Sequence, residues 1–218
     1  MKLLILGATG RTGQLIIKEA LNQDYEINCL VREPKKIRKN HKKLNIYSGS
    51  PDQIDKLEDA MKGCDAIISA LNISRKSDFP WSQLRTPPSF LSDVMKNIIS
   101  LTGKNDIKRL VVCSAWGVAE TEKDIPFWFK WLIRNSNISS AYKEDHEKQE
   151  KILKSSDLKW TIIRPSGLIN SKKDQKIIVS DRNYPKPKIT ISRKSVAEFM
   201  VNALLNQKLI GRTLVISA

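Results

Sequence analysis

MKLLILGATGRTGQLIIKEAL, residues 1–21, is the stretch that decides the fold. Residues 3–6 are a continuous apolar run of the length of a buried strand, and the apolar residues of 15–21 recur at the spacing of one helix face. Between the two patterns lie three glycines: Gly7, Gly10 and Gly13. Because glycine weakens regular elements, three of them at this junction predict a tight turn whose backbone closely approaches another group.

A turn between a buried strand and a helix is suited to holding a phosphate. The free N–H groups of the first helical turn and the positive end of the helix dipole point out of the turn, so a pyrophosphate fits there. Thr9 and Thr12 add hydroxyl donors, and Arg11 adds a positive charge. A glycine motif directly after a strand and before a helix is typical of dinucleotide binding, and the alternative is a glycine-rich turn without a ligand.

Strand and helix patterns alternate along the rest of the chain. Further strands are expected at 27–31, 44–47, 66–69, 109–113 and 160–163. Helices are expected at about 51–62, 89–102 and 139–155. This alternation predicts parallel pairing with right-handed crossovers, and therefore the α/β class. We expect a Rossmann-like, doubly wound parallel sheet that binds its ligand at the carboxyl ends of the strands.

The last fifth of the chain has a different pattern. Residues 177–179 and 188–191 predict a small C-terminal excursion with paired strands. A helix is expected at about 195–206, opened by a capping box of Ser195 and Glu198, before a final strand at 213–216. Since nothing in the composition divides the 218 residues, we expect a single domain over 1–218.

The net charge of +15 reflects 38 Lys and Arg against 23 Asp and Glu. It is compatible with a nucleic-acid surface, a polyanionic ligand or a lysine-rich proteome, and we favour the last with an anionic ligand using a few of the charges. The densest basic run, 35–43, lacks the interleaved aromatics of a single-strand binder. We interpret it as a solvated helix face, which makes nucleic acid an unlikely partner.

No stretch approaches the ~20 apolar residues that a membrane helix needs, and the first residues lack the features of a signal peptide. We therefore expect a cytoplasmic protein, a monomer or dimer, without a membrane partner. Three cysteines, Cys29, Cys64 and Cys113, lie in or beside predicted strands. Their odd number and their spacing favour buried thiols over disulfides or a metal site.

The end of the second strand predicts the choice of cofactor. An acidic residue at this position accepts a hydrogen bond from a ribose 2′-hydroxyl, whereas an arginine meets a 2′-phosphate. Here the strand ends in CLVREP, which places Arg32 at the position and Lys35 and Lys36 behind it, while Glu33 comes one residue late. These residues predict NADP(H); the alternative is that Arg32 is an ordinary surface charge.

Six motifs resemble one family over nearly the whole chain: GATGRTG, LVREP, GCDAIISAL, VVCSA, DHEKQEKILKSSDLKWTIIRPSGL and ISRKSVAEFM. The family is that of the atypical short-chain dehydrogenase/reductases of the NAD(P)H-binding, NmrA-like kind, similar to biliverdin-IX-beta reductase/flavin reductase and its bacterial relatives. The resemblance implies that the phosphates are held by Gly7, Thr9, Gly10, Arg11, Thr12 and Arg32. It further implies that Ala70 and Leu71 border the cofactor and that Pro165 and Ser166 flank its nicotinamide side.

The resemblance also places the family's active-site serine at Ser114, where the alternative is a hydroxyl that satisfies the strand end. Two positions depart from the family. Ser50, in YSGSPD, replaces an aspartate that contacts adenine, which leaves the adenine contact open. YKEDH puts His146 where many relatives carry the lysine of Tyr-x-x-x-Lys, four residues after Tyr142 and therefore on one helix face.

The pair of Tyr142 and His146 is the second catalytic candidate. An imidazolium favours the ionised tyrosine only below about pH 6.5, which would make the pair a weak acid. The alternative is a polar helix face without a catalytic role.

Two aromatic segments, 77–90 and 124–135, are expected to leave the ligand edge of the sheet. Their large side chains and a neighbouring tryptophan suit stacking on a flat conjugated acceptor: Trp81, Trp116, Phe127, Trp128, Trp131 and Leu132. The alternatives are that these residues fold back onto the core or form a dimer contact.

The resemblance implies an NADP(H)-dependent oxidoreductase that passes hydride to a small conjugated acceptor of the flavin, quinone or tetrapyrrole type. Few catalytic residues are needed, because the nicotinamide itself carries the hydride. The alternative function is a non-catalytic, NADP(H)-binding regulator of the NmrA-like kind that senses redox state.

Overall fold

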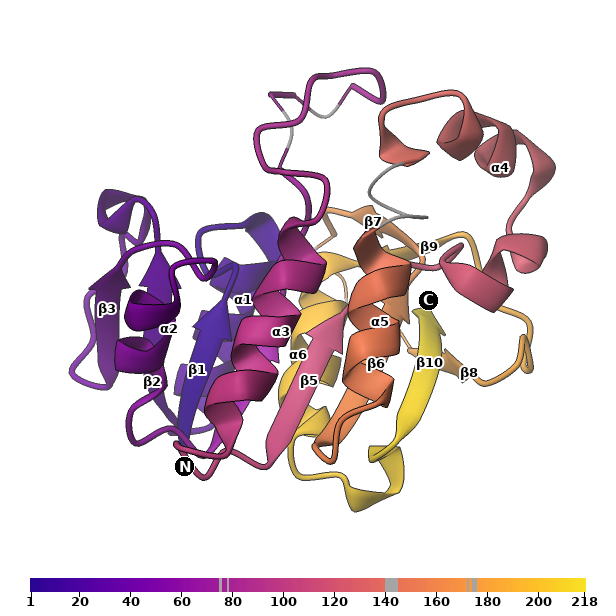
Figure 1. The fold of residues 1–218 in the computed structure, drawn as a ribbon. Helices are drawn as coiled ribbons and strands as arrows, with labels where there is room; N and C mark the ends of the chain where they lie inside the picture. The colour runs from indigo at the N-terminus through magenta and orange to yellow at the C-terminus, as the bar shows by residue number, and fades with distance from the viewer. Residues whose placement is uncertain (75, 78, 140–144, 172, 174–175) are drawn as a thin grey trace.

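The computed structural model describes residues 1–218 except 75, 78, 140–144, 172 and 174–175 (Figure 1). Its central sheet has eight strands in the order β3-β2-β1-β4-β5-β6-β10-β8. The strands are β1 Lys2–Leu6, β2 Glu26–Val31, β3 Leu44–Ser48, β4 Ala66–Ser69, β5 Arg109–Cys113, β6 Lys159–Pro165, β8 Ile178–Ser180 and β10 Arg212–Ser217. All neighbours pair in parallel except β10 and β8, which are antiparallel. The expected doubly wound, Rossmann-like sheet is confirmed.

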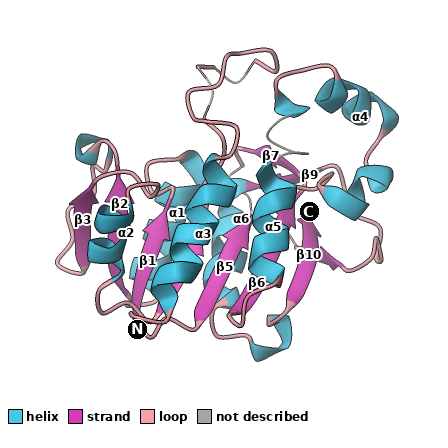
Figure 2. Cartoon of the chain, in the orientation of Figure 1, coloured by secondary structure: helices cyan, strands magenta, loops and turns pink. Residues whose placement is uncertain are grey.

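Helices cover both faces of this sheet (Figure 2). On one face α1 (Arg11–Asn22) packs against α6 (Arg193–Ala203). On the other face lie α2 (Ile54–Met61), α3 (Phe90–Thr102) and α5 (Glu147–Lys154). The two layers on the sheet bury both of its faces, which is the arrangement expected of a parallel sheet.

The strand β1 is apolar throughout because it is buried from both sides. Leu3 and Ile5 face the core under α1 and α6, whereas Leu4 and Leu6 face the core under α2 and α3. This alternation follows from the two-residue period of a strand. The strand pairs with β2 on one edge and β4 on the other. The strand order therefore reverses between β1 and β4, and in such sheets the ligand crevice lies at that point.

The C-terminal excursion is built differently from the prediction. β8 (Ile178–Ser180) and β9 (Thr190–Ser192) do not pair with each other: β8 joins the edge of β10, and β9 pairs in parallel with β7 (Gly167–Ile169). The expected pairing was wrong because strands of three residues take their partners from tertiary context. β8 pairs with the free edge of β10 in the central sheet, and β9 pairs with β7, the short strand that follows β6.

The start of α6 also differs from the expectation. The helix begins at Arg193, and the Ser192 hydroxyl accepts a hydrogen bond from the Ser195 N–H at 3.0 Å. Ser192 is therefore the N-cap, three residues before the predicted cap at Ser195, and the predicted capping box with Glu198 does not form. A serine is a favoured N-cap residue at either position, and the glutamate three residues after Ser195 favoured the wrong one.

Three further segments depart from the predicted elements. The basic run forms one turn of 3-10 helix, Pro34–Lys36, instead of a helix face, because it has too few apolar residues to pack. The helix expected from 139 is described only from Glu147 onward, and Tyr142 lies outside the described residues. The segment 124–135 contains an unpredicted helix, α4 (Phe127–Arg134), which lies beyond the carboxyl end of the sheet (Figure 1).

Among the described residues, no helix is long and apolar enough to span a membrane. Cys29 and Cys64 are buried free thiols, and Cys113 is a partly buried one. Burial raises the pKa of the Cys29 thiol to about 12, so this cysteine is an inert part of the core.

Candidate active site

A cleft of about 890 Å³ opens at the carboxyl ends of the parallel strands. It is lined by the turns that follow β1, β2, β4, β5 and β6. All residues expected to contact the cofactor line it: Gly7, Thr9, Gly10, Arg11, Thr12, Gly13, Arg32, Ala70, Leu71, Pro165 and Ser166. Ser114 lies in the same cleft. The structure thus brings together, in one cavity, residues that are separated by up to 159 positions in the chain.

The three glycines of the β1–α1 turn have different neighbours. A Cβ on Gly7, whose φ is +78°, would lie 2.5 Å from the Ala70 carbonyl oxygen, and one on Gly13 would lie 2.1 Å from the Gly7 carbonyl oxygen. Both glycines are therefore required by the turn's approach to the protein's own backbone. A Cβ on Gly10 has only one close neighbour, at 3.2 Å. Gly10 is thus the glycine whose bare backbone is best explained by a ligand in the cleft.

The N-terminus of α1 opens onto the cleft without a side-chain cap. Gly10 is the N-cap residue, and as a glycine it provides no side-chain cap for the first turn. The uncapped N–H groups and the positive end of the helix dipole form a site suited to a phosphate. Thr9 and Thr12 line the same part of the cleft. These features fit a dinucleotide pyrophosphate.

Arg32 follows β2 and is exposed at the rim of the cleft. Next to this rim is a second cavity of about 550 Å³, which shares Thr9 with the cleft and contains five cationic side chains: Lys18, Lys35, Lys36, Arg38 and Lys39. Lys36 forms an ion pair with Glu33 at 2.6 Å. The hydrogen bond and charge of Lys36 lower the pKa of the Glu33 carboxyl. The carboxylate of Glu33 is therefore paired with Lys36, and the other cationic side chains keep the rim positively charged.

The position of Ser50 bears on the adenine end of the cleft. Its N–H donates to Gln53 Oε1 at 2.9 Å, and the next residue, Pro51, lines the cleft. At this point the wall of the cleft therefore includes the Pro51 ring, and the Ser50 N–H is bonded within the protein.

The opposite end of the cleft combines apolar and hydroxyl groups. Its lining includes Trp116, Phe129, Ser114, Pro165 and Ser166. Ser166 is buried, and its Oγ has no hydrogen-bond partner among the described residues. Buried hydroxyls are almost always hydrogen-bonded in folded proteins. An orphan hydroxyl in the wall of a cleft therefore fits a bound polar group such as the nicotinamide side of the cofactor.

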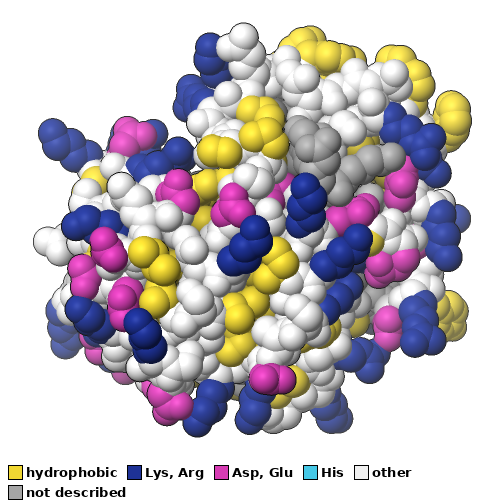
Figure 3. Space-filling model, in the orientation of Figure 1, with side chains coloured by type: hydrophobic (Ala, Val, Ile, Leu, Met, Phe, Trp, Pro, Cys, Tyr) yellow, Lys and Arg dark blue, Asp and Glu magenta, His cyan; other side chains and the backbone are white. Residues whose placement is uncertain are grey.

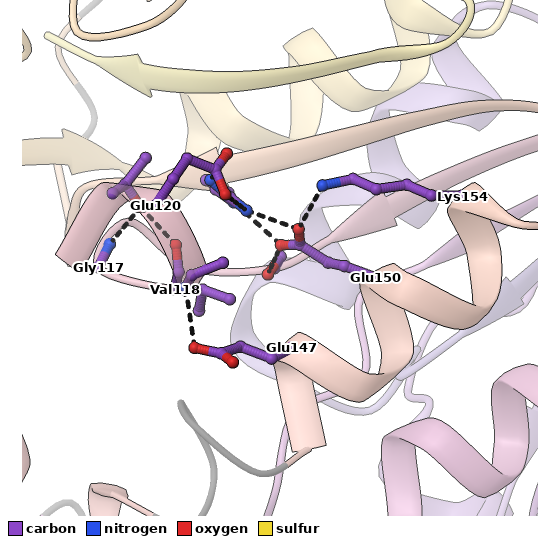
Figure 4. A network of polar contacts seen from close by, with 10 residues as sticks. Gly117, Val118, Glu120, Glu147, Glu150 and Lys154 are labelled. Carbon is purple, nitrogen blue, oxygen red and sulfur yellow. Dashed lines mark hydrogen bonds and ion pairs between the residues drawn. The ribbon is translucent and has the colours of Figure 1, made fainter.

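Ser114 is linked to a network of charged side chains in which Glu150 and Arg164 are buried. Figure 4 labels Glu120, Glu150 and Lys154 of this network. Its Oγ donates to Glu150 Oε1 at 2.7 Å, and Glu150 accepts from Arg164 Nε at 2.9 Å and from Arg164 Nη2 at 2.6 Å. Arg164 also donates to Glu120 at 2.7 Å, and Lys154 donates to the second oxygen of Glu150 at 3.3 Å. The network fixes the end of β5 to α5 and to the end of β6.

Both members of the central pair are charged. Burial alone raises the pKa of Glu150, but the hydrogen bonds and charge of Arg164 outweigh it, and the pKa is lowered. The carboxylates of Glu150 and Glu120 likewise outweigh burial and raise the pKa of Arg164. Removing one partner of such a pair leaves a buried charge uncompensated and costs about 3–5 kcal/mol. The Glu150–Arg164 pair is therefore a rigid part of the site.

Sequence reasoning missed Glu150 and Arg164 as members of the site. Arg164 interrupts the apolar strand TIIRP, and a cation at a buried strand position signals a buried partner. The sequence does not show which of the acidic residues is that partner.

His146 occupies a different environment from the one expected. It is buried behind the cleft wall, and its Nε2 lies 3.3 Å from Oδ1 of Asn72, which lines the cleft. Burial lowers the pKa of His146 to about 4, so the ring is neutral at physiological pH and the expected titration near 6.5 was wrong. The predicted pair with Tyr142 falls on residues outside those described. The preceding Asp145 accepts from the N–H groups of Leu91 and Ser92, at 2.6 and 2.8 Å, and so anchors the start of α3.

The expected aromatic wall is only partly present. Trp116 and Phe129 line the cleft, whereas Phe127, Trp128 and Trp131 are 83%, 58% and 54% exposed on α4. Figure 3 shows hydrophobic side chains at the upper right edge of the molecule, where α4 lies. The two aromatic segments meet there, since Trp81 Nε1 donates to the Asn135 carbonyl oxygen at 2.6 Å.

Comparison with known proteins gives a consistent picture. A family model described as NAD(P)H-binding matches residues 7–207. The oxidoreductase GME11367 of Pestalotiopsis microspora is 25% identical over 182 residues, which cover 75% of this chain and 66% of that protein. ChuY, described as an anaerobillin reductase from Escherichia coli O157:H7, superposes with a TM-score of 0.81 at 16% identity, covering 100% of this chain and 97% of that one.

A short-chain dehydrogenase/reductase of Veillonella parvula DSM 2008, solved in complex with NADP, has a TM-score of 0.76 at 19% identity. The match covers 100% of this chain and 94% of that chain. Both structural similarities show a shared fold.

Proposed function

The chain belongs to the NAD(P)H-binding family, and from this membership we propose an NADP(H)-dependent oxidoreductase that passes hydride to a small conjugated acceptor. The observation that carries the proposal is the continuity of the cleft. One cavity extends from the glycine turn and Arg32 to Ser114, Trp116 and Phe129. It offers a phosphate site at one end and an apolar wall with hydroxyl groups at the other. The names of an oxidoreductase and an anaerobillin reductase among the similar proteins support the same reaction type.

Each part of the cleft has a separate role in this proposal. The N–H groups of the first turn of α1, with Thr9 and Thr12, hold the pyrophosphate, while Ala70 and Leu71 border the cofactor beside the turn. Arg32 meets the 2′-phosphate and selects NADP(H) over NAD(H).

At the far end, Pro165 and Ser166 flank the nicotinamide ring, and Ser114 contacts a ring substituent. Trp116 and Phe129 exclude water and provide flat apolar surface for an acceptor of the flavin, quinone or tetrapyrrole type. Bound NADPH supplies the hydride, so the chain supplies position and polarity.

The proposed function also has consequences for the domain organisation, the compartment and the partner. We propose that residues 1–218 act as one NAD(P)-binding domain, in the cytoplasm, on a small-molecule partner. A nucleic-acid partner does not follow from the basic surface, since the cationic rim adjoins a cleft that suits a dinucleotide.

A second candidate function, a non-catalytic NADP(H)-binding regulator, is favoured by one observation. The described residues that line the cleft include no group that releases a proton at neutral pH. Ser114 is hydrogen-bonded to an ionised carboxylate, His146 lies behind the wall, and burial raises the pKa of Cys113 to about 12.

NADPH oxidation by the purified protein, measured across flavins, quinones and biliverdin, separates the two candidates. Turnover with any acceptor supports the reductase. Tight NADPH binding without turnover supports the regulator. An absence of NADPH and NADH binding would contradict both.

A further inference from the structure

The hydroxyl of Ser114 has its single proton committed to Glu150. An ionised carboxylate has only acceptor atoms, so in the 2.7 Å contact between Ser114 Oγ and Glu150 Oε1 the serine must be the donor. A serine hydroxyl carries one proton and two lone pairs. Toward the cleft, Ser114 therefore presents only lone pairs.

The orientation of Ser114 is fixed by its surroundings. Ser114, Glu150 and Arg164 are all buried. The Ser114 N–H donates to the Ile163 carbonyl oxygen at 2.7 Å, which holds the backbone, and two hydrogen bonds from Arg164 hold the Glu150 carboxylate. Arg164 in turn donates a hydrogen bond to Glu120 at 2.7 Å. The backbone of Ser114 and the carboxylate that accepts its proton are thus both held in place by hydrogen bonds.

We propose that Glu150 is a positioning residue that makes Ser114 an obligate hydrogen-bond acceptor, so that this part of the cleft selects a ring system that presents an N–H group. The inference rests on the proposed function and deepens it. An N–H donor has two possible sources, the nicotinamide carboxamide and a ring N–H of the acceptor, such as the imide of a flavin or the pyrrole of a tetrapyrrole. A simple quinone presents only carbonyl oxygens, which would face the lone pairs of Ser114. If the acceptor is the source, the site therefore favours flavins and tetrapyrroles over quinones.

The network offers a matched pair of variants. In Glu150→Gln an NH2 group replaces one carboxylate oxygen and faces a donor of Arg164 in either orientation, because Oε1 accepts from Ser114 and Arg164 Nε and Oε2 accepts from Arg164 Nη2. This variant therefore weakens the acceptor that holds the serine proton, and the proton becomes able to point into the cleft. Glu120→Gln weakens the pairing of the same arginine without a contact to Ser114, so it is the control for a purely structural effect. Ser114→Ala removes the hydroxyl and leaves the Glu150–Arg164 pair intact.

The readout is equilibrium binding, without turnover, of two ligand pairs that each differ in one N–H group. The first pair is NADP⁺ and its 3-acetylpyridine analogue, in which a methyl replaces the carboxamide NH2. The second pair is lumiflavin and N3-methyl-lumiflavin. The wild type and Glu120→Gln should bind the N–H member of one pair about 5- to 50-fold more tightly, because the other member leaves a buried acceptor unpaired. Ser114→Ala should reduce this preference to less than about twofold, and Glu150→Gln should reduce it more than Glu120→Gln does. The pair that responds identifies the source of the N–H group.

Several outcomes would overturn the inference. One is NADP⁺ binding by the wild type with no preference within either pair, which leaves the proposed function intact. Another is an equal loss of preference in Glu120→Gln and Glu150→Gln, or an unchanged preference in Ser114→Ala. Failure of the wild type to bind any of the four ligands would contradict the proposed function and this inference together. Should Glu150→Gln not fold, the Ser114→Ala comparison alone decides the question.

Discussion

Arg32 stands at the rim of the cleft, beside a cavity lined by five further cations. A charged hydrogen bond to a phosphate is worth about 1.5–3 kcal/mol, so Arg32→Ala should weaken NADPH binding roughly 10- to 150-fold. NADH lacks the 2′-phosphate, and its affinity should stay nearly unchanged. Titration of both cofactors against the wild type and the variant measures the difference. Lys208→Ala, an exposed cation away from the cleft, is the control; an equal loss for both cofactors in Arg32→Ala would contradict the assignment.

The burial of His146 predicts a pH dependence of stability. Its pKa is lowered by burial from 6.5 to about 4, so as the pH falls the unfolded chain takes up the proton first. The free energy of unfolding should therefore decrease as the pH falls from about 6.5 to about 4, by roughly 2–3 kcal/mol. Denaturant unfolding at a series of pH values tests this. His146→Gln should flatten the slope and His41→Gln, at a partly exposed position, should keep it; equal slopes in all three proteins would refute the prediction.

At the level of single residues, the sequence predicted which residues line the cleft at the glycine turn better than it predicted the network behind the opposite end. The glycines, Arg32 and the serines after β5 and β6 lie at strand ends, whose common edge follows from the α/β pattern. The contacts of Glu150 with Arg164 and Ser114 join three separate elements, and the sequence pattern does not encode which charges meet. The environment of His146 was missed for the same reason, because its burial depends on the packing of α5 against α3.

Among the helices, α6 provides a direct test of the observed cap. Ser192→Ala removes the hydrogen bond that the side chain accepts from the Ser195 N–H, and should lower the free energy of unfolding by about 0.5–2 kcal/mol. Glu198 contacts only Lys194, at 3.7 Å, among its described ion pairs. Glu198→Ala should therefore change stability by less than about 0.5 kcal/mol. Thermal or denaturant unfolding of the two variants decides between this cap and the capping box: a large cost at Glu198 with none at Ser192 would favour the box.

The helix α4 gives different exposures to two aromatic residues that are neighbours in the sequence and whose ring centroids lie 5.6 Å apart. Phe129 lines the cleft and packs near Trp116, whereas Trp128 is mostly exposed. With an acceptor that turns over, Phe129→Ala should lower kcat/KM about tenfold or more, because the cleft loses a stacking surface worth about 0.5–1.5 kcal/mol beyond its buried area. Trp128→Ala should leave both turnover and NADPH affinity within about threefold. A larger loss in Trp128→Ala than in Phe129→Ala would show that the exposed ring closes over the substrate.

Regular elements of the sheet were the most predictable parts of the fold. The strands at 66–69 and 109–113 have the predicted bounds. A short, nearly continuous apolar run is typical of a parallel strand that is buried on both faces of the sheet. The strands β8 and β9 were located within about one or two residues, but their partners were not predicted. A three-residue strand makes too few contacts for its own sequence to specify a register.

Considered as a whole, the molecule carries a net charge of +15 over a surface on which Lys and Arg are widely spread (Figure 3). Long-range attraction of an anionic cofactor should therefore depend on salt. Raising the ionic strength from about 0.01 M to about 0.1 M shortens the Debye length from about 30 Å to about 10 Å. The Kd for NADPH should rise several-fold over this range, while that for a neutral flavin such as lumiflavin should change little. Fluorescence titration at the two ionic strengths measures both values, and an identical salt response for the two ligands would contradict an electrostatic contribution to cofactor capture.

The position of β10 has a consequence for how the protein is made. Residues 212–217 insert between β6 and β8, and α6, directly before them, packs on α1 from the beginning of the chain. Synthesis adds about 5–20 residues per second. Until the C-terminal segments are made, the edge of β6 stays unpaired and the apolar face of α1 stays uncovered. The face of α1 gains its partner when α6 emerges from the ribosome, and the edge of β6 gains its partner only when residues 212–217 follow. A messenger RNA truncated before the codons for residues 212–217 would thus yield a chain with an open sheet edge. We expect such a chain to be bound by chaperones and degraded by proteases instead of folding.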